Sequence, residues 1–149
     1  MSVISEDEIR ALAAVRSRSG AVTSCYLDVD GRRHIRPVDY ERVLDTMLRE
    51  ARNDGAVDAT TREDLARIER HVKAGFDRSE VRGLVFFAGG ADELWRVVEL
   101  PVPVRSELII NASPAVGQLE GIVEQAFALG VLAVDRTHAR VFVYRLGEL

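Results

Sequence analysis

The sequence predicts a domain of the α+β type: a mixed, largely antiparallel sheet packed with about four helices, followed by a C-terminal β-hairpin. Apolar residues recur at spacings of three and four after helix-capping signals in about four stretches. In the middle of the chain, runs of β-forming residues follow one another directly, which favours an antiparallel or mixed sheet. The resulting order, α-β-α-α-β-β-β-α-β-β, is not the regular alternation of a doubly wound α/β fold.

Each predicted helix begins at a recognisable signal. A serine or threonine followed three residues later by glutamate fits a capping box, and proline suits a first helical turn because its missing N–H has no partner there anyway. We expect Asn53-Asp54-Gly55 to stop the second helix and Gly130 to end the fourth. The start signals are, in chain order, the capping box of Ser5 and Glu8, Pro37, the capping box of Thr60 and Glu63, and Ser113 with Pro114.

The predicted strands are short apolar or alternating runs bounded by glycine, proline and polar residues. Gly89 and Gly90 join two of them; a hairpin turn suits this pair better than a phosphate-binding loop, whose glycines would open a helix. Trp95 alternates with Val97 and is either a core residue or an interface anchor. The runs cover residues 21–29, 83–88, 94–100, 105–110, 131–134 and 140–144.

Length and composition are those of an ordinary globular protein. The 149 residues suit one domain with at most a fragment of a second, and 47% hydrophobic and 30% charged residues are typical of a soluble protein. A net charge of −4 gives no overall attraction to nucleic acid or to anionic membranes. With no long apolar run, no signal-peptide pattern and a single cysteine, we expect a cytoplasmic protein without a membrane partner.

Residue types that commonly carry chemistry form no recognisable site in the sequence. His34, His71 and His138 have no metal-ligand spacing, so solvated or structural roles are favoured for all three. Cys25 lies within a predicted strand, where a cysteine is typically a small buried hydrophobic residue. No catalytic triad, carboxylate pair or P-loop is recognisable. We therefore expect no enzyme activity, no catalytic residue, no cofactor and no metal site in this chain.

One basic cluster follows the first predicted strand. Arg32, Arg33 and Arg36, together with His34, lie in a loop without interleaved acids. Arginine suits contact with phosphate oxygens, so the three arginines are the candidate contacts if the chain binds RNA. Aspartates on either side of the cluster weaken the local field, and an ordinary solvated loop is the alternative.

The order of the segments is informative. In chain order they are TSCYLDVD, the helices 38–52 and 61–73, GLVFFAGG, VPVRSELIINASPAVGQLEGIVEQA and VLAVDRTHARVFVYRLGEL. In this order and in its hydrophobic pattern, the chain resembles the N-terminal domain of archaeal and eukaryotic class-1 peptide chain release factors, in the form of their bacterial relatives. The resemblance begins near Ala21 and covers nearly all of the chain after it.

The stop-codon motifs of that family have no counterpart here. The connection between the second and third helices reads NDGAVDATTRED where stop-codon readers carry NIKS, and NASPAVGQLEGI lacks the family's Y-x-C-x-x-x-F motif. The GGQ loop that enters the peptidyl transferase centre belongs to a further domain of those factors. The resemblance therefore implies a domain shaped for the ribosomal A site that neither reads stop codons nor hydrolyses peptidyl-tRNA by itself.

Three hypotheses about function follow. The first is a non-catalytic, ribosome-associated domain of a bacterial release-factor relative, which binds the ribosome or its RNA in rescue, quality control or hibernation. The second is a protein-interaction or oligomerisation module that keeps the scaffold without RNA contact. The third is the N-terminal part of a peptidyl-tRNA hydrolase whose catalytic domain is not in this sequence. RNA contact through the basic loop would support the first hypothesis. An exposed apolar edge would support the second, and a downstream catalytic loop would support the third.

The end of the chain carries a prediction of its own. Residues 1–130 form the release-factor-like domain, and residues 131–149 form a hairpin that in that family opens a second domain. The hairpin can fold back on its own domain, pair with the hairpin of a second copy or stay disordered. Because an uncovered hairpin edge recruits other strands, we favour a homodimer in which this hairpin pairs with its copy. The candidate interface residues are Val131, Ala133, Val141 and Val143.

Overall fold

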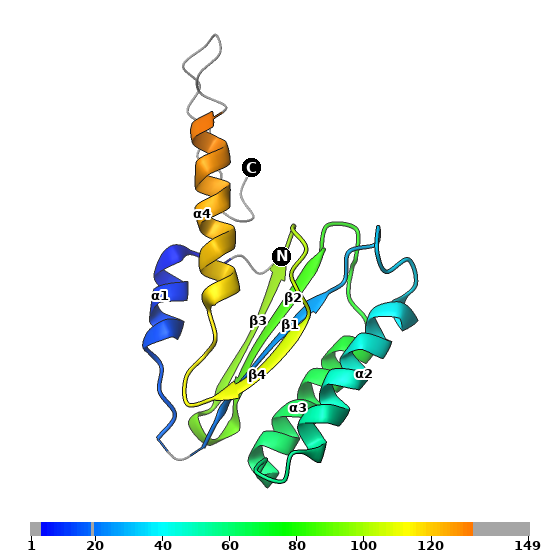
Figure 1. Cartoon of the computed structure of the whole chain (residues 1–149), viewed down its shortest axis with the longest axis vertical. Helices are drawn as coiled ribbons and strands as arrows, with labels where there is room; N and C mark the ends of the chain where they lie inside the picture. The colour runs from blue at the N-terminus through cyan, green and yellow to red at the C-terminus, as the bar shows by residue number, and fades with distance from the viewer. Residues whose placement is uncertain (1–3, 19, 133–149) are drawn as a thin grey trace.

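A four-stranded antiparallel sheet forms the middle layer of the computed structural model, which describes residues 4–18 and 20–132 (Figure 1). The strand order is β3-β2-β1-β4, so β1 and β2 lie inside the sheet and β3 and β4 form its open edges. All neighbouring pairs are antiparallel. The strands are β1 (Val22–Asp28), β2 (Gly83–Gly89), β3 (Leu94–Leu100) and β4 (Glu107–Asn111).

Helices cover both faces of the sheet. In Figure 1, α2 and α3 lie side by side on one face, and α1 and α4 lie on the other. The predicted α+β class, with four helices in the described residues and an antiparallel sheet, is confirmed. The helices are α1 (Glu6–Ala14), α2 (Pro37–Asn53), α3 (Ala59–Lys73) and α4 (Gly117–Leu132).

The two central strands are buried on both faces, which explains the continuous apolar run of β2; β1 also buries the polar residues Thr23, Ser24 and Asp28. Cys25 and its cross-strand partner Phe86 face α2 and α3, whereas Tyr26 and its partner Val85 face α1 and α4. The helices complete the two cores with apolar side chains spaced by three or four residues. Among these are Leu44, Leu48, Leu65 and Ile68 on one side and Ile9, Leu12 and Leu119 on the other.

Several predicted boundaries agree with the structure. The Ser5–Glu8 capping box is present: the Glu8 N–H donates to Ser5 Oγ at 3.2 Å, and the Ser5 N–H donates to Glu8 Oε2 at 2.7 Å. α2 begins at Pro37, as predicted. β2 and β3 are joined by a short 3-10 turn, η1 (Gly90–Asp92), which confirms the hairpin.

The predicted start of α3 is wrong by two residues. The N-cap is Asp58, whose Oδ1 accepts a hydrogen bond from the Thr61 N–H at 2.8 Å, and Thr60 already lies inside the helix. Aspartate is as good an N-cap as serine and better than threonine, so the earlier acid takes the position.

The predicted start of α4 is also wrong, because tertiary hydrogen bonds hold the chain before it. The Ala115 N–H donates to Ser24 Oγ on β1 at 2.9 Å, and the Tyr26 hydroxyl donates to the Ala115 carbonyl oxygen. These bonds tie the stretch after Ser113 to the sheet, and the helix begins only at Gly117.

α4 continues through Gly130 to Leu132, so Val131 belongs to this helix and does not begin a strand. A glycine inside a helix costs only about 1 kcal/mol, and the alanine and leucine residues around it are good helix formers. The rest of the predicted hairpin, with Ala133, Val141 and Val143, lies outside the described residues, as does His138.

None of the helices in the described part of the chain is long and apolar enough to cross a membrane.

Candidate functional site

The basic cluster lies at one end of the sheet, where three connections meet. The register pairs Asp28 with Gly83, Gly83 with Leu100, and Tyr26 with Glu107. The end of β1, the start of β2, the end of β3 and the start of β4 are therefore neighbours. As a result, the β1–α2 loop, the α3–β2 loop and the β3–β4 connection share this end (Figure 1).

The aspartates in the β1–α2 loop shape its backbone. Asp28 Oδ1 accepts the N–H of Asp30 at 3.0 Å, and Asp30 Oδ1 accepts the N–H of Arg32 at 3.1 Å. The Asp30 carbonyl oxygen accepts the N–H groups of Arg33 and His34 at 3.0 and 2.8 Å. Such Asx turns satisfy backbone donors inside a tight loop. The aspartates that weaken the positive field of the arginines therefore also hold the backbone of the loop in place.

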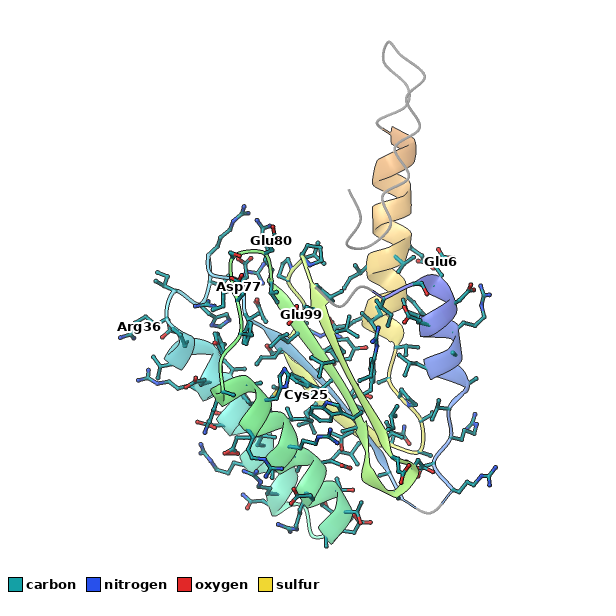
Figure 2. All side chains as sticks on the ribbon, turned by 180° about the vertical axis from the view of Figure 1, so that it is seen from behind. Glu6, Cys25, Arg36, Asp77, Glu80 and Glu99 are labelled. Carbon is teal, nitrogen blue, oxygen red and sulfur yellow. The ribbon has the colours of Figure 1, made fainter. Side chains whose placement is uncertain are left out.

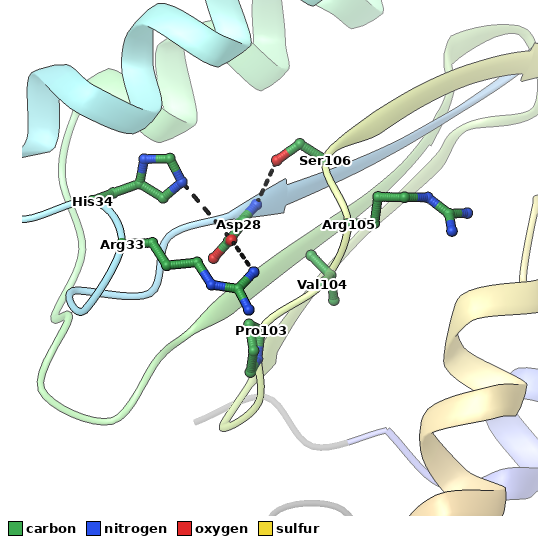
Figure 3. Close-up of a pocket in the computed structure, with 7 residues that line it drawn as sticks. All are labelled: Asp28, Arg33, His34, Pro103, Val104, Arg105 and Ser106. Carbon is green, nitrogen blue, oxygen red and sulfur yellow. Dashed lines mark hydrogen bonds and ion pairs between the residues drawn. The ribbon is translucent and has the colours of Figure 1, made fainter.

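A hollow of about 390 Å³ opens beside this loop (Figure 3). Asp28 lies in its middle, with Oδ2 3.2 Å from Arg33 Nη1 and 3.8 Å from His34 Nε2. The Asp28 N–H donates to Ser106 Oγ at 2.9 Å, so the β3–β4 connection is bound to the end of β1. The hollow is lined by Asp28, Arg33, His34, Pro103, Val104, Arg105 and Ser106.

The serine, histidine and aspartate in this hollow are not arranged as a hydrolytic triad. In a triad the histidine lies between the other two and takes the proton of the hydroxyl. Here Asp28 lies in the centre, with His34 and Ser106 on opposite sides of it (Figure 3). Ser106 Oγ accepts the Asp28 N–H, and the nearest partner of the His34 imidazole is the Asp28 carboxylate and not this hydroxyl.

The ion pairs around the hollow share one orientation: the arginine points to solvent and its carboxylate is covered. The exposed fractions of the side chains are 65% for Arg33 against 9% for Asp28. The β3–β4 connection repeats the pattern, with 76% for Arg105 against 28% for Glu107.

Arg36, at the N-terminus of α2, follows the same pattern. Its side chain is 68% exposed and that of Asp39 is 27% exposed, with Nη2 and Oδ1 3.3 Å apart. The Arg36 N–H donates to Asp39, and this bond together with the guanidinium charge lowers the pKa of the Asp39 carboxyl.

Ion pairs elsewhere on the surface are less consistently oriented: the Arg52–Glu69 pair differs only slightly in exposure, 36% against 27%, and others have the acid outward. Asp7 and Glu63, the partners of Arg10 and Arg70, are 91% and 71% exposed, more than their arginines. A ligand that approaches there meets both signs of charge equally. At the sheet end it meets guanidinium groups first, although each has an acid behind it.

The remaining predicted residue, Arg32, is exposed on the same loop, so the structure keeps Arg32, Arg33 and Arg36 together. Next to them Ile35 is 78% exposed, the more exposed of two large apolar side chains that face solvent in the described residues. Sequence reasoning missed Arg105, because only the pairing of β4 with β1 brings it to this end.

Other candidates have structural roles. Cys25 is fully buried, and burial raises the pKa of its thiol to about 12. His71 packs edge-on against Phe86, with ring centres 5.4 Å apart. Trp95 is packed partly against the core, with the Arg67 guanidinium carbon 4.0 Å from its ring centre. Within residues 4–18 and 20–132, no group of histidine, cysteine and acidic residues could hold a metal ion.

Comparisons with known proteins inform the fold. No protein-family model matches this chain, and no curated protein sequence matches it. Among solved structures, one described as an archaeal protein is similar over 85% of this chain, with a TM-score of 0.57 and 17% sequence identity. The present chain spans 38% of that archaeal chain. At this identity the similarity supports the fold alone.

Proposed function

We propose that this chain is a non-catalytic, ribosome-associated domain that contacts RNA phosphates through the arginine end of its sheet and does not read stop codons. In this proposal it is a release-factor-like domain that acts in ribosome rescue, quality control or hibernation. The observation that carries the proposal is the shared orientation of the ion pairs of Arg33, Arg36 and Arg105, cation outward and acid inward.

Phosphate groups suit this arrangement better than other anions of similar charge. Guanidinium groups that project from two connections offer planar donor pairs at separate points, as a chain of phosphates requires. Contacts of this kind position a protein on RNA without reading its sequence. The net charge of −4 provides no overall attraction to RNA, so the proposed binding depends on these local phosphate contacts and weakens as salt rises.

The absence of stop-codon reading is supported by the connection between α2 and α3. It lies at the opposite end of the helix pair from the arginine loop (Figure 1). Its acids are engaged with their own backbone: Asp54 Oδ1 accepts the Ala56 N–H at 3.0 Å, and Asp58 caps α3. An acidic turn at this position is unsuited to approach an RNA base beside its phosphates.

Cosedimentation with ribosomes at low and moderate salt tests the proposal. Arg33→Gln with Arg105→Gln removes two cations and keeps polar side chains, so binding is expected to weaken about tenfold at low salt. The matched control is Arg10→Gln with Arg70→Gln, which removes two similarly exposed, ion-paired arginines that do not line the hollow. Equal binding by wild type and both double variants would contradict the proposal.

A variant of opposite sign sharpens the test. Glu80 and Asp77 lie at the same end of the sheet as Arg36 (Figure 2). Removing a negative charge there with Glu80→Gln is expected to strengthen RNA binding, most clearly at low salt. Weaker binding by this variant would count against a phosphate ligand.

The second candidate function, a protein-interaction module, is favoured by Ile35. An exposed isoleucine beside arginines is the kind of anchor that protein interfaces use. If Ile35→Ser abolishes ribosome binding while the Arg33 and Arg105 double variant retains it, the contact is with protein and the RNA proposal fails.

A further inference from the structure

An arginine outside the basic loop, Arg78, binds the backbone of that loop. Arg78 lies on the α3–β2 loop and extends its guanidinium under the backbone of the β1–α2 loop. Nη2 donates to the carbonyl oxygen of Val29 at 3.2 Å and also to that of His34, while Nη1 donates to that of Ile35 at 3.3 Å. Its three acceptors thus lie at both ends of the loop, before and after the first two arginines.

The surroundings of Arg78 suit a residue that holds the loop backbone. Its guanidinium carbon lies 4.9 Å from the centre of the Tyr40 ring, which supports the group from one side. Its Nε atom is buried without a hydrogen-bond partner among the described residues. Its hydrogen bonds run to carbonyl oxygens, so within the described chain the guanidinium binds backbone and not acid.

We infer that Arg78 is a positioning residue: it fixes the loop that carries Arg32, Arg33 and Arg36 in the shape that presents them together. This inference rests on the proposed function for its consequence and on the hydrogen bonds for its mechanism. The three bonds start from two nitrogens of one planar guanidinium, whereas lysine would have to make them all from a single ammonium nitrogen, so lysine is expected to replace arginine poorly here. A loop held in advance loses less entropy when its side chains bind a ligand.

Two substitutions of Arg78 test this role. Arg78→Met keeps the apolar stem and removes every donor, and Arg78→Lys keeps the charge with a single donating nitrogen. Both should loosen the loop and leave the sheet intact, the methionine variant more. The control is Arg62→Met, which removes an arginine that donates to one carbonyl oxygen, that of Arg52, at the other end of the helix pair.

Amide hydrogen exchange reads the loop directly. The N–H groups of Arg33 and His34, which bond to the Asp30 carbonyl oxygen, are expected to exchange at least about tenfold faster in Arg78→Met. The amide of Cys25 in β1 should keep its wild-type rate, and Arg62→Met should change none of the three. Unchanged loop exchange, or loss of folding by both Arg78 variants, would overturn the inference.

RNA binding then separates positioning from direct contact. Because Arg78→Met leaves the three loop arginines in place, its affinity for single-stranded RNA is expected to fall about tenfold without a change in salt dependence. A flatter salt dependence would make Arg78 a phosphate contact and overturn the inference. If the wild-type chain binds no RNA, the proposed function fails, and the exchange measurement still decides whether Arg78 positions the loop.

Discussion

Asp64 on α3 accepts a hydrogen bond from the Gly90 N–H at 3.1 Å and so joins this helix to the turn between β2 and β3. The approach is close because residue 90 has no side chain: a Cβ there would lie 3.0 Å from Asp64 Oδ1 and 3.1 Å from Thr60 Cγ2. The glycine pair that could have contacted a phosphate instead makes room for a carboxylate.

The burial of Asp64 makes a prediction about pH. Burial raises the pKa of this carboxyl, more than the Gly90 hydrogen bond lowers it. A raised pKa means that folding favours the protonated acid, so the contribution of Asp64 is greatest below about pH 4 and is lost as the pH rises through the folded-state pKa. Asp64→Asn, which still accepts the N–H, is therefore expected to stabilise the protein at neutral pH.

Urea unfolding of both proteins at about pH 7 and about pH 3.5 measures this difference. The gain in the free energy of unfolding should shrink at the lower pH, where the wild-type carboxyl is also protonated. A gain that is larger in acid would show that the Gly90 hydrogen bond, and not burial, dominates.

Cys25 supplies a probe of global unfolding. It is the single cysteine of the chain, it is fully buried, and the pKa of its thiol is raised to about 12. Because the thiolate is the reactive form, modification by a disulfide reagent at about pH 8 should be more than about a hundredfold slower in the folded protein than in denaturant. Rapid labelling without denaturant would mean that β1 opens locally, contrary to its place in the sheet.

Elements with strong local signals were predictable from the sequence. β3 covers the predicted residues 94–100, and α2 begins at Pro37 and stops within the predicted segment Asn53-Asp54-Gly55. Boundaries set by distant partners were not predictable. The start of α4 depends on hydrogen bonds from Ala115 to Ser24 and from Tyr26 to Ala115, and no sequence window contains both sides of these contacts.

The candidate site divides in the same way. The loop arginines are adjacent in sequence, so their cluster was recognisable. Arg105 and Arg78 were not, because the first reaches the hollow through the β1–β4 pairing and the second through hydrogen bonds to a loop more than 40 positions away. The turns formed by Asp28 and Asp30 were also not predicted, because in the sequence both residues were considered only as charges.

Stop-codon discrimination is expected to be absent. The chain lacks both codon-reading motifs, and its α2–α3 turn is acidic. Affinities for ribosomes with a stop or a sense codon in the A site should differ by less than about 1.4 kcal/mol, a factor of ten. A filter-binding comparison on the two programmed ribosomes measures this, and a larger preference for stop codons would mean that other residues read them.

The predicted homodimer depends on residues beyond the described part of the chain. Light scattering on the intact chain and on one that ends at Leu132, the last residue of α4, tests it. The prediction is a dimer for the first and a monomer for the second, because the shorter chain lacks Ala133, Val141 and Val143. A monomeric intact chain would refute the dimer, and two equal dimers would place the interface elsewhere.

The salt dependence of RNA binding tests the central claim most directly. Each phosphate contact to single-stranded RNA contributes about −0.7 to the slope of log affinity against log salt concentration, so replacing Arg32, Arg33 and Arg36 with alanine should flatten the slope by up to about 2. Replacing Arg10, Arg62 and Arg70 removes the same charge elsewhere and should leave the slope nearly unchanged. Equal slopes and affinities for wild type and both triple variants would contradict the account.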